Sequence, residues 1–336
     1  TCGTGGDGAG TFNISTTAAF VLSAAGCQVA KHGNRGVSSG VGSADVLESL
    51  GCPLTADPEI SARLLSETGF AFLYAPAHHP ALATVGPIRK ALGIRTIFNL
   101  LGPLVNPACA RRQLIGVFDP AMVRPMAEAL LELERERALV VHCEGLDEIG
   151  LHAPTQGVSL EHGTLTDITI DPTALGFEHA PIEALKGGDA AANAATTREV
   201  LGGAAGPKSD IVALNAGVAL SLTDVASDHA AGVELARRQM AIVNGQRDGR
   251  GRVAITGRAN GFDPRCLQFR RIVRQGAVES VGRAPRGHHD HGGGGEPAGP
   301  VAIDAGKFGL AVTDRRQIVA GDNIDPELDQ ARLDAV

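Results

Sequence analysis

The sequence predicts an α/β fold on three observations. Short apolar strand patterns, at 70–74 and 138–142, alternate with segments in which apolar residues recur at helical spacing. An acidic turn and a β-hairpin pattern follow the second of these strands. The glycine-rich amino-terminal run leads directly into a helical pattern. Strands that alternate with helices in this way are typical of enzymes built on a sheet with helices packed against it.

The first half of the chain contains three predicted helices. The first covers 15–29, where alanine, valine and leucine side chains share one face. A shorter helix runs over 43–50, with Ser43 as its N-cap and Gly51 at its end. Asp57-Pro58 is typical of a third helix start, and that helix leads to the strand at 70–74.

The second half continues the alternation. An amphipathic helix over 121–137 precedes the buried strand at 138–142, which leads into the acidic turn at 145–148. The stretch 158–170, interrupted at 161–163, predicts a β-hairpin. Three further helices are expected, at 190–201, 209–222 and 228–240.

The amino-terminal segment 1–16 has the composition of a phosphate-binding loop. Glycines allow successive backbone N–H groups to approach phosphate oxygens, and the helix that follows adds unpaired N–H donors and the positive end of its dipole. Asn13, Ser15 and Thr16 add short polar side chains that suit phosphate oxygens or a hydrated cation. This order of residues predicts a phosphorylated ligand.

Two alternatives compete for the same glycines. Gly3, Gly5 and Gly8 fit the dinucleotide pattern G-x-G-x-x-G, but that pattern is meaningful only after a strand and within a βαβ unit. A flexible linker is the other, although linkers do not lead into a helix-capping Asn/Ser/Thr cluster. The sequence contains no G-x-x-x-x-G-K-[ST], which argues against a P-loop nucleotidase.

A second polar block follows the first helix, with the sequence KHGNRGVSS and then GSADVLESLG. Taken singly, Lys31 and Arg35 would be solvated surface charges, and Ser43 only a helix N-cap. Together, two cations, an amide and several hydroxyls near a second glycine-rich turn suit a ligand that carries more than one phosphate.

The composition fits a cytosolic enzyme. The chain has 30 basic and 37 acidic residues and a formal net charge of −7, which is not the signature of nucleic-acid binding. No apolar run approaches the roughly 20 residues of a membrane-spanning helix. The cysteines lack C-x-x-C spacing, so they are expected to be reduced packing thiols. They are Cys2, Cys27, Cys52, Cys109, Cys143 and Cys266.

Five ordered motifs resemble anthranilate phosphoribosyltransferase, over residues 1 to about 243. They read GTGGDG-x-x-TFNIST, KHGNRGVSS, GSADVLESLG, IRKALGIRTIFNLLGPLVNP and GLDEI. The resemblance implies a large α/β domain with a central mixed sheet and flanking helices. It also implies an amino-terminal helical subdomain, which is largely missing from this chain.

The resemblance also implies the reaction. Members of this family join anthranilate to phosphoribosyl pyrophosphate, with Mg²⁺ as cofactor, and release pyrophosphate. No protein nucleophile is needed, because catalysis consists of positioning and of stabilising the leaving group. A cytoplasmic homodimer that acts on small molecules, without nucleic-acid or membrane partners, is implied as well.

The matching positions define the expected site. Those for phosphoribosyl pyrophosphate are Gly6, Asp7, Thr11, Asn13, Ile14, Ser15, Thr16, Lys31, Gly33, Asn34, Ser38, Ser39 and Ser43. Those for anthranilate are Gly3, Asn34 and Arg89, with Arg89 pairing with the carboxylate. Ser15 would hold one Mg²⁺, and Asp147 with Glu148 the second. Without the resemblance, an Asp-Glu pair would be interpreted as a solvated turn.

The same match places His32 and His79 near the aromatic amine. A base that takes the amine proton is one role for them, but a lone histidine is more often a positioning donor.

The segment 244–336 departs from the family pattern. We interpret it as an atypical, partly disordered tail, out-of-frame or fused, beside a catalytic domain at 1–243. His288, His289 and His291 suggest a metal site, although a disordered polar loop is the simpler interpretation.

Three functions remain open from the sequence. The first is phosphoribosyl transfer to anthranilate. The second is that of a related pyrimidine nucleoside phosphorylase, whose own signature is absent. The third is a non-catalytic or truncated, inactive relative that binds a ligand or nucleic acid.

Overall fold

The computed structural model describes residues 1–36, 40–52, 54, 57–79 and 96–245. Its strands are β1 (Cys2–Gly3), β2 (Val29–Gly33), β3 (Phe70–Tyr74), β4 (Arg112–Gly116), β5 (Arg137–His142), β6 (Thr155–Glu161) and β7 (Thr164–Ile170). Its α-helices are α1 (Ile14–Ala24), α2 (Ser43–Ser49), α3 (Pro58–Thr68), α4 (Ala75–His78), α6 (Phe98–Leu104), α7 (Val123–Glu132), α8 (Ala190–Leu201), α9 (Pro207–Ser221) and α10 (His229–Gly245). Short 3-10 turns are η1 (Pro120–Met122), η2 (Thr173–Leu175) and η3 (Ile182–Leu185).

The expected central mixed sheet is present, in the order β1-β4-β5-β6-β7. The first three strands are parallel, with Cys2 opposite Ile115 and Ile115 opposite Val140, whereas β6 and β7 are antiparallel. Parallel strands end at the same edge of a sheet, so the glycine-rich loop after β1 and the acidic turn after β5 emerge side by side. The topology therefore brings together two motifs that lie far apart in the sequence. A separate parallel pair, β2 and β3, was not expected.

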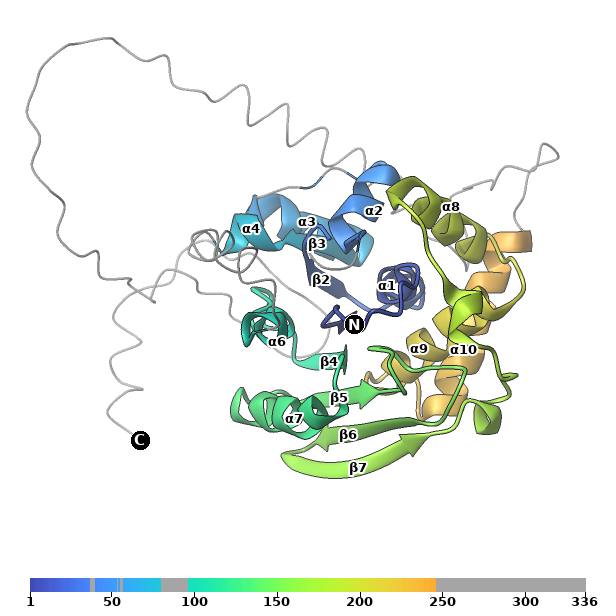
Figure 1. Cartoon of the computed structure of the whole chain (residues 1–336). Coiled ribbons are helices and arrows are strands. Elements are labelled where there is room, and N and C mark those ends of the chain that lie inside the picture. Colours follow the sequence, from blue (N-terminus) through green and yellow to red (C-terminus); the bar gives the residue numbers. More distant parts are fainter. Residues whose placement is uncertain (37–39, 53, 55–56, 80–95, 246–336) are drawn as a thin grey trace, which may run out of the picture. The chain divides into compact units, whose positions relative to one another are not determined.

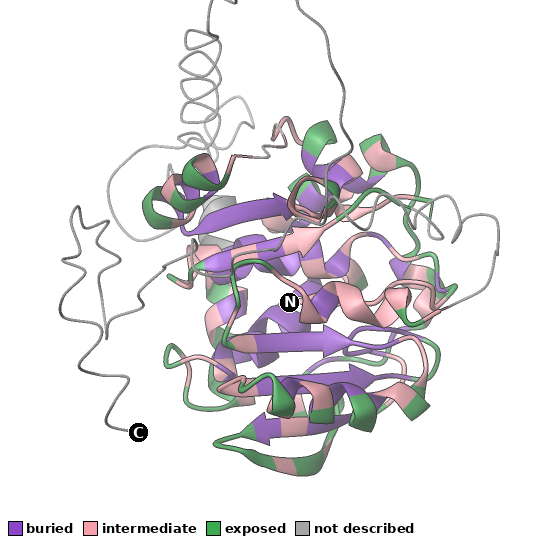
Figure 2. Ribbon diagram, turned by 90° about the vertical axis from the view of Figure 1, so that its left-hand side faces the viewer, coloured by how far each residue is buried: buried purple, intermediate pink, exposed green. Residues whose placement is uncertain are grey.

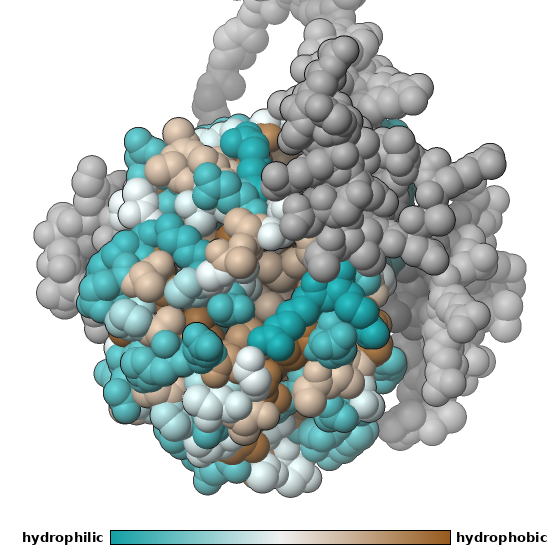
Figure 3. Space-filling view, turned by 90° about the vertical axis from the view of Figure 1, so that its right-hand side faces the viewer, coloured by the Kyte–Doolittle hydropathy of each residue, from teal (hydrophilic) through white to brown (hydrophobic). Residues whose placement is uncertain are grey.

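Helices cover both faces of this sheet (Figure 1). On one face Ile115 and Val140 pack with Met126 and Leu130 of α7. On the other, alternate strand residues such as Leu114 join the larger core that contains α1 and α9. The strands at the centre are buried, whereas the β6–β7 edge carries exposed residues (Figure 2). Around α8 and α10, hydrophobic and hydrophilic residues alternate over the surface (Figure 3).

Several elements match their predicted bounds. The strand β3 and the helix α8 coincide with the expected ranges, and α3 begins at Pro58 with Asp57 as its N-cap. The Asp57 carboxylate accepts hydrogen bonds from the N–H groups of Glu59 and Ile60 at 2.8 and 3.4 Å. The hairpin β6–β7 turns at His162 and Gly163, both with positive φ, which is the two-residue turn that a hairpin favours.

Two predicted helices were too long, and both end before a strand. The helix expected at 15–29 ends at Ala24, because Gly26 has a φ of +96° and Val29 then pairs with Phe70 in the β2–β3 pair. The helix expected at 121–137 ends at Glu132. Apolar periodicity does not distinguish the last turn of a helix from the start of a buried strand.

The prediction that Ser43 is the N-cap of α2 was wrong. Its N-cap is Gly42, and Ser43 is its first residue. The Asp45 carboxylate accepts the Gly42 N–H at 2.9 Å. Ser43 is thus freed from the capping role, and its side chain lies against Gly33 at the end of β2.

The remaining expectations concern chemistry and the tail. The cysteines within the described ranges are free thiols, as expected, and Cys266 lies outside those ranges. In the same ranges, no helix is long and apolar enough to span a membrane. Apart from the final turn of α10, the atypical segment 244–336, with its three histidines, also lies outside the described residues.

Candidate active site

The glycine-rich loop between β1 and α1 has the backbone that an anion-binding loop needs. Gly5, Gly6, Gly8 and Gly10 all have positive φ values, between 62° and 79°. Only glycine adopts this region without strain, so the repeated glycines are required by the path of the loop. The loop then enters α1 at Ile14, which adds the N–H groups of a first helical turn.

Acidic side chains stabilise this loop by accepting hydrogen bonds from its backbone. The Asp147 carboxylate accepts the Gly5 N–H at 2.6 Å, and Asp7 accepts the Ala9 N–H at 3.1 Å. Asp7 also accepts the backbone N–H of Asp147, at 3.4 Å. Gly3 lies so close to Asp147 that an added Cβ would collide with its carboxylate. The loop and the acidic turn are therefore one structural unit.

The acidic turn is held in place by residues that sequence reasoning missed. His142 Nδ1 donates to the Val117 carbonyl at 2.8 Å, while its Nε2 accepts the Gly145 N–H at 3.2 Å. On the far side, the buried Asn215 carboxamide exchanges hydrogen bonds with both backbone groups of Ile149. No sequence motif marks these two residues, because their partners come from separate elements.

Lys31, Ser15 and Glu148 meet at the first turn of α1. Lys31 Nζ donates to Ser15 Oγ at 3.2 Å and to the Thr1 carbonyl at 2.9 Å, and only 4% of Lys31 is exposed. Burial lowers the pKa of Lys31, whereas the nearby Cys2 and Glu148 raise it. Burial raises the pKa of Glu148 to about 7, against the opposing effects of Lys31 and of hydrogen bonds from Ser15.

Carboxylates outnumber cations at this point. Burial raises the pKa of Asp147 well above its usual range, and the neighbouring charges of Asp7 and Glu148 raise it further. Buried carboxyl groups that lie close together stay protonated until a nearby cation neutralises their negative charge. The arrangement is suited to a cation that approaches from the loop side.

This donor set fits Mg²⁺, which prefers oxygen ligands and retains several waters. The hydroxyl of Ser15 and the carboxylates of Asp147 and Glu148 supply such ligands. Among the described residues, no group of three or more His, Cys, Asp and Glu side chains is arranged to hold a metal. Phosphate oxygens and water would therefore complete the coordination. Ser15 lies beside Glu148, so the residues expected for two metal positions form one continuous site.

The second polar segment flanks the loop. The Asn34 carbonyl accepts the Ala44 N–H at 3.2 Å, which ties the end of β2 to α2. Arg35 pairs with Asp45 at 3.1 Å and Glu48 at 2.5 Å, so it has a structural role on the surface. Ser38 and Ser39 lie outside the described residues, and their expected phosphate contacts stay predictions.

The two expected histidines lie together. The rings of His32 and His79 are 5.1 Å apart and edge-to-face. His32 Nδ1 lies 3.1 Å from the Gly102 carbonyl and donates to it, which leaves Nε2 as a buried acceptor that lacks a partner in the described part of the chain. Burial, against the opposing effect of the hydrogen bond to Gly102 and with a further contribution from His79 and His78, lowers the pKa of His32 to about 4, so its ring is neutral near pH 7. His78 was not predicted. Arg89 lies outside the described residues.

Other predicted residues contribute backbone rather than side chains. Ile14 and Thr16 are 2% and 1% exposed, so only their backbone could face a ligand, and the Ile14 N–H already donates to the Phe12 carbonyl at 2.8 Å. Thr11 pairs its backbone with Lys186 in an isolated bridge. Lys186, which was not predicted, donates from Nζ to the Ala9 carbonyl at 2.6 Å.

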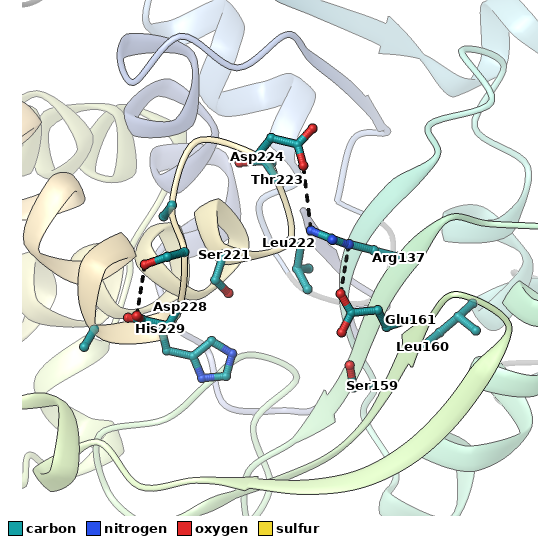
Figure 4. A pocket seen from close by; sticks show the side chains of 13 residues that line it. Arg137, Ser159, Leu160, Glu161, Ser221, Leu222, Thr223, Asp224, Asp228 and His229 are labelled. Carbon is teal, nitrogen blue, oxygen red and sulfur yellow. Dashed lines mark hydrogen bonds and ion pairs between the residues drawn. The ribbon is translucent and has the colours of Figure 1, made fainter.

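A cavity of about 830 Å³ lies elsewhere, at the carboxyl-terminal end of α9 (Figure 4). Arg137 and Glu161, opposite each other on β5 and β6, form an ion pair of 3.1 Å at one side of it, with Asp224 near Arg137, and Asp228 and His229 line another side. None of the predicted site residues that the structure describes lines this cavity, and its arginine pairs with Glu161 and Asp224. Its size therefore does not make it the candidate active site.

The α/β fold and the glycine-rich loop after β1 define the class of protein to which the chain belongs. The family model described as "Glycosyl transferase family, a/b domain" matches residues 1–246. A protein named anthranilate phosphoribosyltransferase from Synechococcus sp. (strain JA-3-3Ab) is 53% identical over 243 residues, which are 72% of this chain and 71% of the relative. One of the same name from Chloroflexus aggregans is 52% identical over 240 residues, 70% of this chain and 71% of the relative.

Solved structures of proteins with the same name are also similar to this chain. Anthranilate phosphoribosyltransferase from Thermus thermophilus has 48% identity and a TM-score of 0.67, and the match covers 70% of this chain and 71% of that one. The Saccharomyces cerevisiae enzyme in complex with PRPP and Mg has 25% identity and a TM-score of 0.68, over 83% of this chain and 73% of that one. The chain belongs to the anthranilate phosphoribosyltransferase family.

Proposed function

We propose that this protein transfers the phosphoribosyl group of phosphoribosyl pyrophosphate to the amine of anthranilate, with Mg²⁺, in tryptophan biosynthesis. The observation that carries the proposal is the meeting of Lys31, Ser15 and Glu148 beneath a positive-φ glycine loop at a helix start. That arrangement combines a cation, backbone donors and acidic oxygens within one site, as a metal-bound pyrophosphate requires. Membership of the family indicates that anthranilate is the acceptor of the phosphoribosyl group.

In this reaction a bond forms between the anomeric carbon and the amine nitrogen, and the bond from that carbon to pyrophosphate breaks. The amine loses one proton. Because the sugar gains positive charge as pyrophosphate leaves, catalysis depends on groups that hold the departing oxygens. We assign that task to the glycine loop and Lys31, with Asn13, Ser43 and Asn34 on the sugar-phosphate side. Bound Mg²⁺ would neutralise part of the pyrophosphate charge, held by Ser15, Asp147 and Glu148.

The anthranilate amine is assigned to the side where His32 and His79 lie. A neutral His32 whose Nδ1 is bonded to Gly102 has a free acceptor at Nε2, which suits a hydrogen bond from the amine or the uptake of its proton. Gly3 and Asn34 would line the same side. Arg89 stays the predicted partner of the anthranilate carboxylate.

Assembly and location are part of the proposal. A homodimer follows from the family resemblance, as does a division between a catalytic domain at 1–243 and a distinct tail at 244–336. Charged, phosphorylated substrates of this kind support a cytoplasmic location. Neither a nucleic-acid nor a membrane partner is expected.

The test is loss of anthranilate fluorescence when phosphoribosyl pyrophosphate and Mg²⁺ are added to the protein. We expect a decay that EDTA abolishes and that excess Mg²⁺ restores. A protein that binds phosphoribosyl pyrophosphate but leaves anthranilate fluorescence unchanged, also with amino-terminal helices of a relative attached, would contradict the proposal and favour a non-catalytic relative.

A further inference from the structure

The segment before α8 runs along the glycine loop. Phe12 N–H donates to the Leu185 carbonyl at 3.0 Å, and Gly187 N–H donates to the Gly10 carbonyl at 3.0 Å. The first turn of α8 then lies beside the start of α1. Asn193, on that turn, is 2% exposed, and none of the sequence motifs includes it.

Asn193 belongs to a relay of three hydrogen bonds. Its Oδ1 accepts the Gly188 N–H at 2.8 Å, and its Nδ2 donates to Asn13 Oδ1 at 3.0 Å. Asn13 Nδ2 then faces the Val41 carbonyl, in the turn before α2, at 3.4 Å. That last bond is long, so the Asn13 amide is held mainly by Asn193.

The relay has only one consistent orientation. A backbone N–H can only donate, so Asn193 must present its oxygen to Gly188 and its NH₂ to Asn13. Asn13 must then accept with its own oxygen, and its NH₂, which faces the Val41 carbonyl, keeps a second N–H for another acceptor. A phosphate has acceptor oxygens only, so this is the orientation that binds it.

We propose that Asn193 is a positioning residue for phosphoribosyl pyrophosphate: it fixes the Asn13 carboxamide with its NH₂ toward the sugar-phosphate. The proposal rests on the proposed function, which places that ligand at Asn13. The residue contacts no substrate itself. Asn193 acts on the ligand only through the Asn13 amide. Its effect on binding can therefore be measured separately from any effect on turnover.

Asn193→Asp is the sharpest test. The new carboxylate keeps the shape and still accepts the Gly188 N–H, but it cannot donate to Asn13. Asn13 then turns its NH₂ toward this carboxylate and its oxygen toward the phosphate. We expect the Kd for phosphoribosyl pyrophosphate with Mg²⁺, measured by titration calorimetry, to rise at least tenfold, and its KM likewise, while the KM for anthranilate changes less than twofold.

Thr197→Val is the matched control. Thr197 is on the same helix and shares a buried hydrogen bond of 3.1 Å with Thr17 of α1, whose hydroxyl donates to the Asn13 backbone carbonyl at 3.0 Å, so this variant perturbs the backbone of Asn13 and not the hydrogen bond from Asn193. This variant should leave the Kd for phosphoribosyl pyrophosphate within twofold of the wild type. An equal rise in both variants would indicate looser packing between α1 and α8 and would overturn the proposal.

A double-variant cycle decides whether Asn193 acts through Asn13. Asn13→Ala alone should raise the Kd about tenfold, and adding Asn193→Asp should raise it less than twofold more. Additive effects would overturn the proposal. If Asn193→Asp does not fold, Asn193→Ala takes its place, with an expected rise of about threefold, and an unchanged Kd there would also overturn it.

The two proposals fail separately. A wild type that binds phosphoribosyl pyrophosphate without turnover would contradict the function, while the Kd ratios would still support or overturn the role of Asn193. An active wild type with an unaltered Asn193→Asp variant would overturn the role of Asn193 alone. A wild type that does not bind this ligand would overturn both.

Discussion

Two groups of charged side chains differ in what surrounds them. Around the cavity at the end of α9, Arg137 pairs with Glu161 at 3.1 Å, and its side chain and that of Glu161 are 23% and 55% exposed. At the start of α1, Lys31, Asp147 and Glu148 are each at most 8% exposed. In the first group the arginine has an acidic partner, and the acid is half exposed. In the second, acids outnumber the single lysine.

The difference shows which group is prepared for a ligand. Exposed ion pairs contribute about 0–1 kcal/mol and are screened by salt. Buried charges cost far more to desolvate, so an arrangement that leaves them uncompensated persists where a bound partner completes it. The raised pKa of Glu148, about 7, is the measurable sign of this imbalance. The cavity at the end of α9 carries no such sign.

Removing the lysine should have the largest effect. Lys31→Met deletes a cation that donates to Ser15, so kcat/KM for phosphoribosyl pyrophosphate should fall on the order of 10³-fold, as for loss of a donor to a developing anion. Fluorescence decay of anthranilate measures it. Arg137→Met, at the cavity, is the control and should change kcat/KM less than twofold. Comparable losses in both variants would erase the distinction between the two groups.

Neutralising Glu148 should change how stability depends on pH. Its folded pKa of about 7 lies above the ordinary 4.5, so the folded protein holds this proton up to a higher pH than the unfolded chain does. Stability is then full below pH 4.5 and falls as pH rises to 7, by roughly 3 kcal/mol at most, since each pKa unit is about 1.4 kcal/mol. Glu148→Gln should make that fall smaller, and the part that persists belongs to Asp147, whose pKa burial also raises. Urea unfolding without Mg²⁺ at pH 5 and pH 8 measures it.

Glu144→Gln, on the same turn but exposed, is the control for Glu148→Gln and should keep the wild-type pH dependence. Mg²⁺ should stabilise the wild type more at pH 8 than at pH 6, because a bound carboxylate must be deprotonated. A Glu148→Gln variant with the wild-type slope between pH 5 and pH 8 would show that another group carries the titration.

His32 should have a smaller, acceptor-specific effect. Asn at this position can keep the hydrogen bond to the Gly102 carbonyl but lacks an acceptor at Nε2, so His32→Asn should lower kcat about tenfold and leave the KM for phosphoribosyl pyrophosphate unchanged. His162→Asn, at the exposed hairpin turn, is the control. With saturating Mg²⁺, the His32 ring should add no acid limb to kcat near pH 6.5, because its pKa is about 4.

The cavity ion pairs should give the smallest effect. Glu161→Gln breaks the pair with Arg137, and we expect a loss of stability below about 1 kcal/mol that disappears in 1 M salt, with activity unchanged. Thermal unfolding at low and high salt measures it. A loss of several kcal/mol, or any change in anthranilate turnover, would mean that this cavity is more than a solvated surface.

Local patterns were sufficient for much of the fold. The strand at 70–74, the helix cap at Asp57 and the hairpin turn at His162-Gly163 were predictable because each depends on neighbours within a few residues. The bounds of α1 and α7 were not. Where a helix gives way to a buried strand, both are apolar, and pairing with a distant strand decides the boundary.

By itself the sequence determined the chemical groups of this protein: the glycines of the loop, the cation and hydroxyls that follow it, and the acidic pair of the GLDEI motif. Only the tertiary structure decided their neighbours and their charge states. Asn193 reaches Asn13 across 180 positions, and Glu148, which follows β5 of the five-stranded sheet, meets Lys31 of the separate β2–β3 pair. Desolvation depends on every element that excludes water from a group, and no short segment of sequence contains all of those elements.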